Sequence, residues 1–283
     1  MSDLRVSVLC MAVYPLLAWF TISVASAEEP EDPDAKERAS AQRLELMHEL
    51  VHQFSAVPLD EDDDGDLELQ SEPIMRYNDP ARGLMDSTVW RLGQKGRPHA
   101  LIAVELIKRD EQYLASYEFL AVETPRYIGE FRRFVWEPPD GVAEFQEIPN
   151  APTPAKTKRG RLTQMKQMAR RFKAHQQLGE TNYNLRMLPQ PVHRYQPTDA
   201  ADADAAAFAF TYGVNPEVLM LIETDGTKWT FACLRLSVAR LTVDLDGEPA
   251  WSANPTGRRE FQNPNEVYTQ ARQYVPIPNA EIN

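Results

Sequence analysis

Two histidines and a glutamate in the first third of the chain have the residue types and spacing of a zinc-hydrolase motif. They form His48-Glu49-Leu50-Val51-His52, inside a segment whose apolar spacing predicts a helix. Because residues four apart share a helix face, both imidazoles can bind one Zn²⁺ while Glu49 acts as the general base on its water. A zinc metallohydrolase is therefore one candidate function.

A catalytic zinc needs a third protein ligand, and the surrounding sequence does not supply one at a typical spacing. The metzincin extension fails, because Ser55 stands at its glycine position and Pro58 at its final histidine position. Glu68 and Glu72 lie in an acidic, proline-containing stretch with no predicted helix to hold them. We therefore favour a solvated helix face that carries two histidines, and we assign no metal, catalytic or cofactor-binding residue.

The acidic run Asp60–Asp66 is similar to the start of an EF-hand calcium loop, with Leu67 at the apolar eighth position. The twelfth position, where a bidentate glutamate belongs, is Ser71, and Pro58 and Pro73 disfavour the flanking helices. A calcium-modulated binding module is thus a second alternative, and a solvated acidic loop is the expectation.

A basic cluster lies in or just before a second predicted helix, at Lys156, Lys158, Arg159, Arg161, Lys166, Arg170, Arg171 and Lys173. Such runs are usually exposed helix surface, and contact with an acidic polymer, a membrane surface or a partner is the functional alternative. The chain has no G-x-S-x-G elbow, P-loop, dinucleotide fingerprint or paired C-x-x-C motif. These absences favour a protein that is not an enzyme.

The first 27 residues have the pattern of a secretory signal peptide. Arg5 precedes an apolar run from Val6 to Val24, and Ala25-Ser26-Ala27 forms a small-x-small cleavage site before Glu28. A run of this length could also remain as a membrane anchor, but Pro15 and the well-formed cleavage site favour removal. We expect an exported protein, periplasmic, envelope-associated or secreted, that is not an integral membrane protein after cleavage.

The formal net charge of −12 opposes general attraction to nucleic acid or anionic lipid, so no nucleic-acid partner is expected. After cleavage Cys233 is the one cysteine left, which excludes a disulfide within the chain. It lies in the alternating pattern Trp229-Thr230-Phe231-Ala232-Cys233, which predicts a buried, inert thiol on a strand.

Hydrophobic periodicity predicts two amphipathic helices, at Ala35–Phe54 and Arg161–Leu178, and a short C-terminal helix from Asn263 to Tyr274. Alternating apolar residues predict strands at Thr88–Leu92, Ala100–Ile107, Tyr113–Glu123, Tyr127–Trp136, Phe208–Tyr212, Glu217–Glu223, Lys228–Leu236 and Ala239–Leu245. Asp225-Gly226 and Asp246-Gly247 favour type I′ turns between antiparallel strands. The Ala/Asp-rich segment Asp199–Ala207 is expected to be a loop, and no internal repeat is identified.

Six parts of the chain have a familiar sequence: Glu72–Gly83, Gly96-Arg97-Pro98, Arg161–Lys166 with Arg171-Phe172, Gln190–Tyr195, Phe208–Phe210 and Asn215–Val218. Together they resemble a group of uncharacterised exported proteins found in planctomycete-type bacteria. The resemblance covers about residues 70 to 250 and excludes the His48–His52 helix. It implies export and a single β-rich domain, and it carries no functional residue over to this chain.

Taken together, these patterns predict an α+β fold: a single domain with a largely antiparallel, meander-like sheet, one amphipathic helix packed on it, and an N-terminal helix. The expected organisation is a signal peptide (1–27), an acidic spacer, helix and acidic loop (28–69), the α+β domain (70–252) and a C-terminal segment with a short helix (253–283). The expected function is that of a non-enzymatic, exported cell-envelope protein that binds or supports a protein or envelope-polymer partner.

Overall fold

The computed structural model describes residues 33–59, 67–80, 83–123, 127–139, 143–257 and 262–278. The signal peptide predicted at 1–27 and the acidic run Asp60–Asp66 lie outside these residues. Within them the chain is an α+β protein of antiparallel sheets and two helices, as the sequence predicts. No helix of this described part has the length and apolar character needed to cross a membrane.

Two antiparallel sheets form the centre of the molecule. The first sheet contains, in spatial order, β18 (Tyr268–Pro276), β5 (Gln112–Ala121), β4 (Ala100–Arg109), β3 (Leu84–Leu92) and β2 (Met75–Asp79). The second sheet contains β11 (Arg186–Met187), β13 (Asp204–Tyr212), β14 (Asn215–Thr224), β15 (Trp229–Arg235) and β8 (Gln146–Glu147), and β12 (His193–Tyr195) also pairs with β13. Alternate residues of the two sheets, such as Leu101 and Leu219, share one buried cluster, so the sheets pack face to face.

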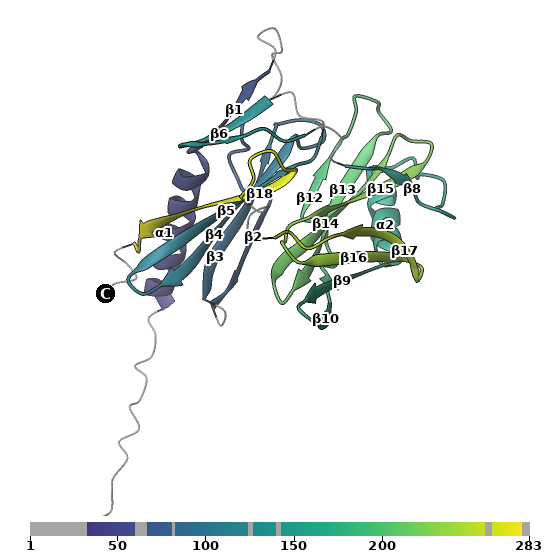
Figure 1. Cartoon of the computed structure of the whole chain (residues 1–283). Coiled ribbons are helices and arrows are strands. Elements are labelled where there is room, and N and C mark those ends of the chain that lie inside the picture. The colour runs from purple at the N-terminus through teal and green to yellow at the C-terminus, as the bar shows by residue number, and fades with distance from the viewer. Residues whose placement is uncertain are drawn as a thin grey trace, which may run out of the picture.

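A helix and a small sheet cover the outer face of each central sheet, giving the layered arrangement seen in Figure 1. On the first sheet these are α1 (Pro33–Val51) with β1 (Phe54–Pro58), β6 (Tyr127–Phe131) and β7 (Phe134–Trp136). On the second they are α2 (Lys158–Ala169) with β9 (Phe172–Leu178), β10 (Thr181–Asn184), β16 (Arg240–Leu245) and β17 (Glu248–Ala253). Each layer therefore buries its apolar face against the next.

The chain contains two structural repeats, which we call the first repeat (33–136) and the second repeat (158–253). Each begins with a helix and a strand, continues through three long strands, and ends in a hairpin whose first arm pairs with the strand after the helix. Thus β1 pairs with β6 in the first repeat, and β9 pairs with β16 in the second. The expectation of no internal repeat is wrong.

Residues at equivalent places in the two repeats are 118 positions apart up to the hairpin that joins β4 to β5. The helices align as Arg43-Leu44, Met47 and Phe54 with Arg161-Leu162, Met165 and Phe172. The following segments align as Pro73, Arg76-Tyr77, Asp86, Pro98 and Glu105 with Pro191, Arg194-Tyr195, Asp204, Pro216 and Glu223. Between these positions most side chains differ, which is why the repeat escapes inspection of the sequence alone.

The two repeats exchange a strand. After the hairpin of the first repeat, β8 pairs with β15 of the second, at Glu147 opposite Thr230. After the hairpin of the second repeat, β18 pairs with β5 of the first along nine residues, from Tyr268 opposite Leu120 to Pro276 opposite Gln112. Each repeat therefore completes the central sheet of the other.

The predicted C-terminal helix from Asn263 to Tyr274 is wrong, because Tyr268–Pro276 is the strand β18. Asn263 and Pro264 are a local signal for a helix start, but a full ladder to β5 satisfies the backbone groups of this segment instead. Within the predicted C-terminal segment, Tyr268–Pro276 is consequently part of the central sheet. Within the predicted N-terminal segment, α1 packs on this sheet, since Met47 and Val51 are fully buried.

Both predicted amphipathic helices end earlier than expected. α2 stops at Ala169, and Phe172–Leu178 is the strand β9, in which Phe172, Ala174 and Gln176 alternate as buried residues. At the equivalent place α1 stops at Val51, and Phe54 begins β1. In each case an apolar residue that continues the helical spacing lies on a strand instead. The strand forms because β9 pairs with β16 and β1 pairs with β6, and this pairing overrides the local helical pattern.

The segment Asp199–Ala207, expected to be a loop, contributes its last four residues to β13. Ala205 and Ala207 are fully buried between the two central sheets, and Ala206 faces α2. Small side chains allow the sheets to approach closely here, so a composition typical of a loop serves as a buried strand.

The two predicted type I′ turns have different outcomes. Asp246 and Gly247 both have positive φ, 54° and 93°, directly between the paired residues Leu245 and Glu248, which confirms that turn. Of Asp225 and Gly226 only the glycine has positive φ, 95°, so this connection is not type I′. The Asp225 carboxylate instead accepts hydrogen bonds from the backbone N–H groups of Thr227 and Lys228.

Candidate functional site

A buried aspartate in each repeat joins the helix to the central sheet. Asp204 accepts hydrogen bonds from Arg161 of α2 at 3.0 Å and from Arg194 of β12 at 2.6 and 2.8 Å. Asp86 accepts equivalent bonds from Arg43 of α1 and Arg76 of β2. Because the same unit occurs in both repeats, we interpret it as part of the scaffold.

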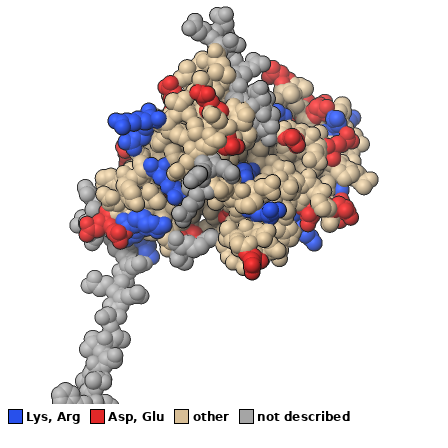
Figure 2. Space-filling view, viewed as in Figure 1, with Lys and Arg blue, Asp and Glu red and all other residues tan. Residues whose placement is uncertain are grey.

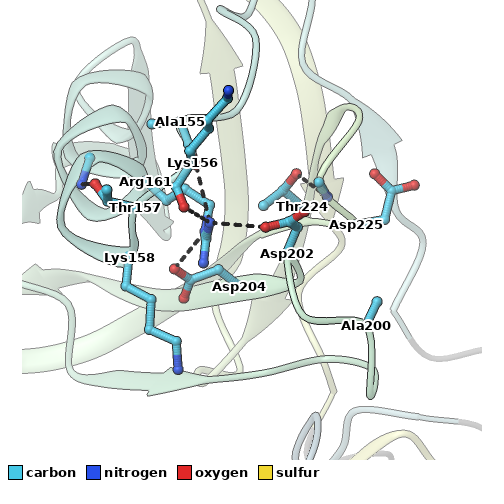
Figure 3. A network of polar contacts seen from close by, with 12 residues as sticks. Ala155, Lys156, Thr157, Lys158, Arg161, Ala200, Asp202, Asp204, Thr224 and Asp225 are labelled. Carbon is cyan, nitrogen blue, oxygen red and sulfur yellow. Dashed lines mark hydrogen bonds and ion pairs between the residues drawn. The ribbon is translucent and has the colours of Figure 1, made fainter.

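Figure 3 shows how the second repeat builds this unit around Arg161. Its Nη1 donates to the carbonyl oxygens of Ala155 and Lys156, just before α2, while its Nε faces Asp204. The Thr157 hydroxyl caps α2 by accepting from the Gly160 N–H. The guanidinium thus fixes the start of the helix on β13.

The predicted basic cluster is consequently not one exposed face. Arg161 is buried, Arg171 pairs with Asp246 at 2.6 Å, and Lys166 donates to the Gln190 side chain. Several cationic side chains of the cluster are therefore engaged by contacts within the chain. Over the face seen in Figure 2, cationic and anionic side chains are interspersed.

A tyrosine–glutamate pair is also repeated, and Arg97 pairs with the copy in the second repeat. Tyr77 donates to Glu105 at 3.1 Å, and Tyr195 donates to Glu223 at 2.7 Å. Arg97 of the first repeat reaches across and donates to both carboxylate oxygens of Glu223, at 2.8 and 2.6 Å. This bidentate ion pair ties the two repeats together beside the cleft described next.

A cleft of about 660 Å³ lies between the repeats, and we call it the inter-repeat cleft. Its volume falls in the usual range of small-molecule sites. The first repeat lines it with Gln70, Arg91, Gln94, Lys95 and Gly96, and the second repeat with residues 193–199. Both repeats are therefore needed to form it.

Arg91 and His193 meet at this cleft from opposite repeats. Arg91 Nη1 lies 2.9 Å from His193 Nε2, and Arg91 Nη2 donates to the carbonyl oxygens of Lys95 and Gly96. A guanidinium can only donate, so His193 Nε2 must be the acceptor and the ring proton lies on Nδ1. Burial and the Arg91 charge lower the pKa of His193 to about 4, which keeps the ring neutral at neutral pH.

Four residues that line the cleft differ from the residues at the equivalent positions of the other repeat. The residues that correspond to Arg91 and His193 are Ala209 and Met75. Those that correspond to Gln94 and Lys95 are Tyr212 and Gly213. Since the scaffold residues repeat and these do not, they are the best candidates for a function beyond folding.

The structure brings His48 and His52 together, and the described part of the chain places no third metal ligand beside them. Their rings stack at 4.1 Å, both lie edge-on to Trp90, and His52 Nδ1 is 2.8 Å from the His48 carbonyl oxygen. Glu49 is exposed. Among the described residues no three His, Cys, Asp or Glu side chains are placed to hold a metal ion.

The second repeat carries Lys166, Gln167 and Arg170 where the first has His48, Glu49 and His52. This helix position therefore accepts unrelated polar residues, as a solvent face does. A cavity of about 350 Å³ does adjoin His52, and Glu68 also lines it.

Cys233 is buried in β15, and burial raises the pKa of its thiol far above the ordinary value. A protonated thiol is neither a nucleophile nor a metal ligand, which fits the predicted inert role. The acidic run Asp60–Asp66, which the calcium alternative requires, lies outside the described residues.

Sequence reasoning missed the inter-repeat cleft altogether. Arg91 and His193 are 102 positions apart, and neither belongs to a motif of known chemistry. The one available signal was the repeated Arg-Tyr at 76–77 and 194–195, which would have aligned the halves and exposed the residues that differ.

Comparison of the chain with protein-family models, curated proteins and solved structures finds no match. The fold and the geometry of the inter-repeat cleft are thus the grounds on which a function can be argued.

Proposed function

We propose that this is a non-enzymatic, exported binding protein of the cell envelope whose ligand site is the inter-repeat cleft. The observation that carries the proposal is the lining of that cleft. Both repeats contribute to it, and Arg91, Lys95 and His193 stand where the equivalent places have Ala209, Gly213 and Met75. A polar ligand of small-molecule size fits this lining.

The chemistry of the lining favours binding over catalysis. A general base works best when its pKa lies near the working pH, and the pKa of His193 is lowered to about 4. Its Nε2 also accepts from the permanently charged Arg91. The Thr198 hydroxyl accepts from the Ala200 N–H, so this side chain is engaged by its own turn.

The exported location rests on the leader and its Ala25-Ser26-Ala27 end. N-terminal sequencing of the protein from its native host should find Glu28 as the first residue. An intact Met1 in a membrane fraction would contradict export as a soluble protein.

A thermal-shift screen tests the binding function directly. Purified protein is mixed with polar small molecules, including neutral and acidic sugars from bacterial envelopes, and hits are measured by calorimetry. Gln94→Tyr places in the cleft the residue that the second repeat has there, and should abolish binding without unfolding the protein. Gln167→Tyr, on the exposed face of α2, is the matched control. Ligands that bind both variants equally would place the site elsewhere.

A further inference from the structure

We infer that the ligand of the inter-repeat cleft is an anion that presents a carboxylate or phosphate group. This inference rests on the proposed binding function and adds the charge of the ligand. It follows from the net charge of the residues that line the cleft, from their hydrogen-bond donors, and from the residues that differ between the two repeats.

The lining is cationic although the chain carries a net charge of −12. Among the described residues, Arg91, Lys95 and Arg194 line it, against one carboxylate, Asp199, which is exposed. Arg194 shares Asp204 with Arg161, so that single carboxylate faces two guanidinium groups. In this described lining, positive charge therefore exceeds negative charge.

The carboxylate of Asp202 has little effect on the charge balance of the cleft. Asp202 lies 3.8 Å from Arg161, but its side chain is 73% exposed, so water screens its charge strongly. Arg91, by contrast, is only 2% exposed. A charge held out of water interacts more strongly with an ion that enters beside it.

The cationic side chains that line the cleft are hydrogen-bond donors. Arg91 can only donate, and because His193 Nε2 accepts from it, the proton of the imidazole is on Nδ1. The Lys95 ammonium and the Arg194 guanidinium likewise have donor groups only. Carboxylate and phosphate oxygens are acceptors with full or partial negative charge, and bonds from cationic donors to them are the stronger class.

The equivalent place in the other repeat keeps only one of these cationic side chains, since Arg76 corresponds to Arg194. Arg91 is replaced by Ala209, Lys95 by Gly213 and His193 by Met75. The fold thus forms without cationic side chains at the places of Arg91 and Lys95, which points to a ligand as the reason for them.

Isothermal titration calorimetry with three probes tests the charge. Galacturonate and galactose have the same ring and differ in one carboxylate, and inorganic phosphate separates the two sources of an anion. We expect galacturonate or phosphate to bind at least tenfold more tightly than galactose. Lys95→Met should weaken that binding about fivefold or more, and raised salt should weaken it further. Lys173→Met, on the exposed outer face of β9, should leave it unchanged.

The outcomes separate this inference from the proposed function. If galactose and galacturonate bind equally and Gln94→Tyr abolishes both, the cleft binds a neutral ligand, so the binding function stands and the inference is wrong. If Lys95→Met and Lys173→Met weaken binding equally, attraction is general and the inference is also wrong. If the screen and all three probes give no binding, both are overturned.

Discussion

Asp86 and Asp204 hold the same place in the two repeats, and each accepts hydrogen bonds from an arginine 10 positions earlier and from one 43 positions earlier in the chain. Both carboxylates are buried. The coincidence of both spacings identifies the repeat more firmly than any stretch of similar sequence. It also separates residues that the fold requires from those that vary between the repeats.

Asp204→Asn should be strongly destabilising, because it leaves a buried guanidinium without its carboxylate. Removing one partner of a buried ion pair costs about 3–5 kcal/mol. Asp86→Asn should cost less, since Arg43 and Arg76 are 14% and 31% exposed whereas Arg161 is 3% exposed. Urea unfolding measures both. The exposed Asp202→Asn is the control, expected within about 0.5 kcal/mol of the parent, and equal stability of Asp204→Asn would contradict the prediction.

The strand exchange predicts that the first half cannot fold alone. A fragment of residues 28–142 lacks β18, which pairs with β5, and exposes the face of the first sheet that contacts Leu219 and Leu221. We expect it to be insoluble or unfolded alone, and to form a 1:1 complex when co-expressed with residues 143–283. Circular dichroism and co-purification measure this. A cooperative thermal transition of the fragment alone would refute the prediction.

The sequence predicts the strands and the antiparallel pairing well where local signals and tertiary pairing agree, as at Asp246-Gly247. It fails where they disagree. Phe172 extends a helical stripe but lies on β9, and Asn263-Pro264 indicates a helix where β18 pairs with β5. Such pairings join residues far apart in the chain, and a local window does not contain them.

The candidate site could not be predicted for a related reason. His48-Glu49-Leu50-Val51-His52 attracts attention because its spacing is local, whereas Arg91 and His193 meet only through the packing of two repeats. The alignment of the two repeats shows that Arg91 stands where the second repeat has Ala209. The proposed binding site is identified by differences between the repeats, which a search for known motifs does not detect.

Gly226→Ala should destabilise the protein more than Gly179→Ala. Both glycines have positive φ, 95° and 59°, which costs a residue with a Cβ about 1–2 kcal/mol. A Cβ at Gly226 would also lie 2.7 Å from Asp202 Cβ, whereas nothing lies within 4 Å of one at Gly179. Thermal unfolding compares the two variants. If they melt together, the close approach of Gly226 to residue 202 is wrong.

Replacing His48 and His52 by the residues of the second repeat tests the zinc alternative. The double variant His48→Lys, His52→Arg should keep the fold, with a stability change of about 0.5 kcal/mol or less, as is usual at exposed positions. Metal analysis of the parent protein should find less than one zinc per chain. One tightly bound zinc in the parent that the variant loses, with peptidase activity that depends on Glu49, would make the hydrolase the better assignment.

Glu118 predicts a pH-dependent stability. Its carboxyl is buried beside Glu105 and Glu217, and desolvation followed by the Glu105 charge raises its pKa well above the ordinary value, although Tyr268 and Gln270 hydrogen-bond to it. A raised pKa means that the folded state holds its proton more tightly than the unfolded state. This contribution to stability is complete below the ordinary carboxyl pKa and is lost as pH rises through the raised value.

Glu118→Gln removes the ionisation while keeping a polar side chain of the same shape. We expect the variant to unfold at a higher temperature than the parent at pH 8, with the difference shrinking towards pH 4, where the parent carboxyl is protonated in both states. The exposed Glu111→Gln is the matched control and should show no such trend. Thermal unfolding at pH 4, 6 and 8 measures the effect. A difference between Glu118→Gln and the parent that stays constant across this range would show that Glu118 ionises normally between the sheets.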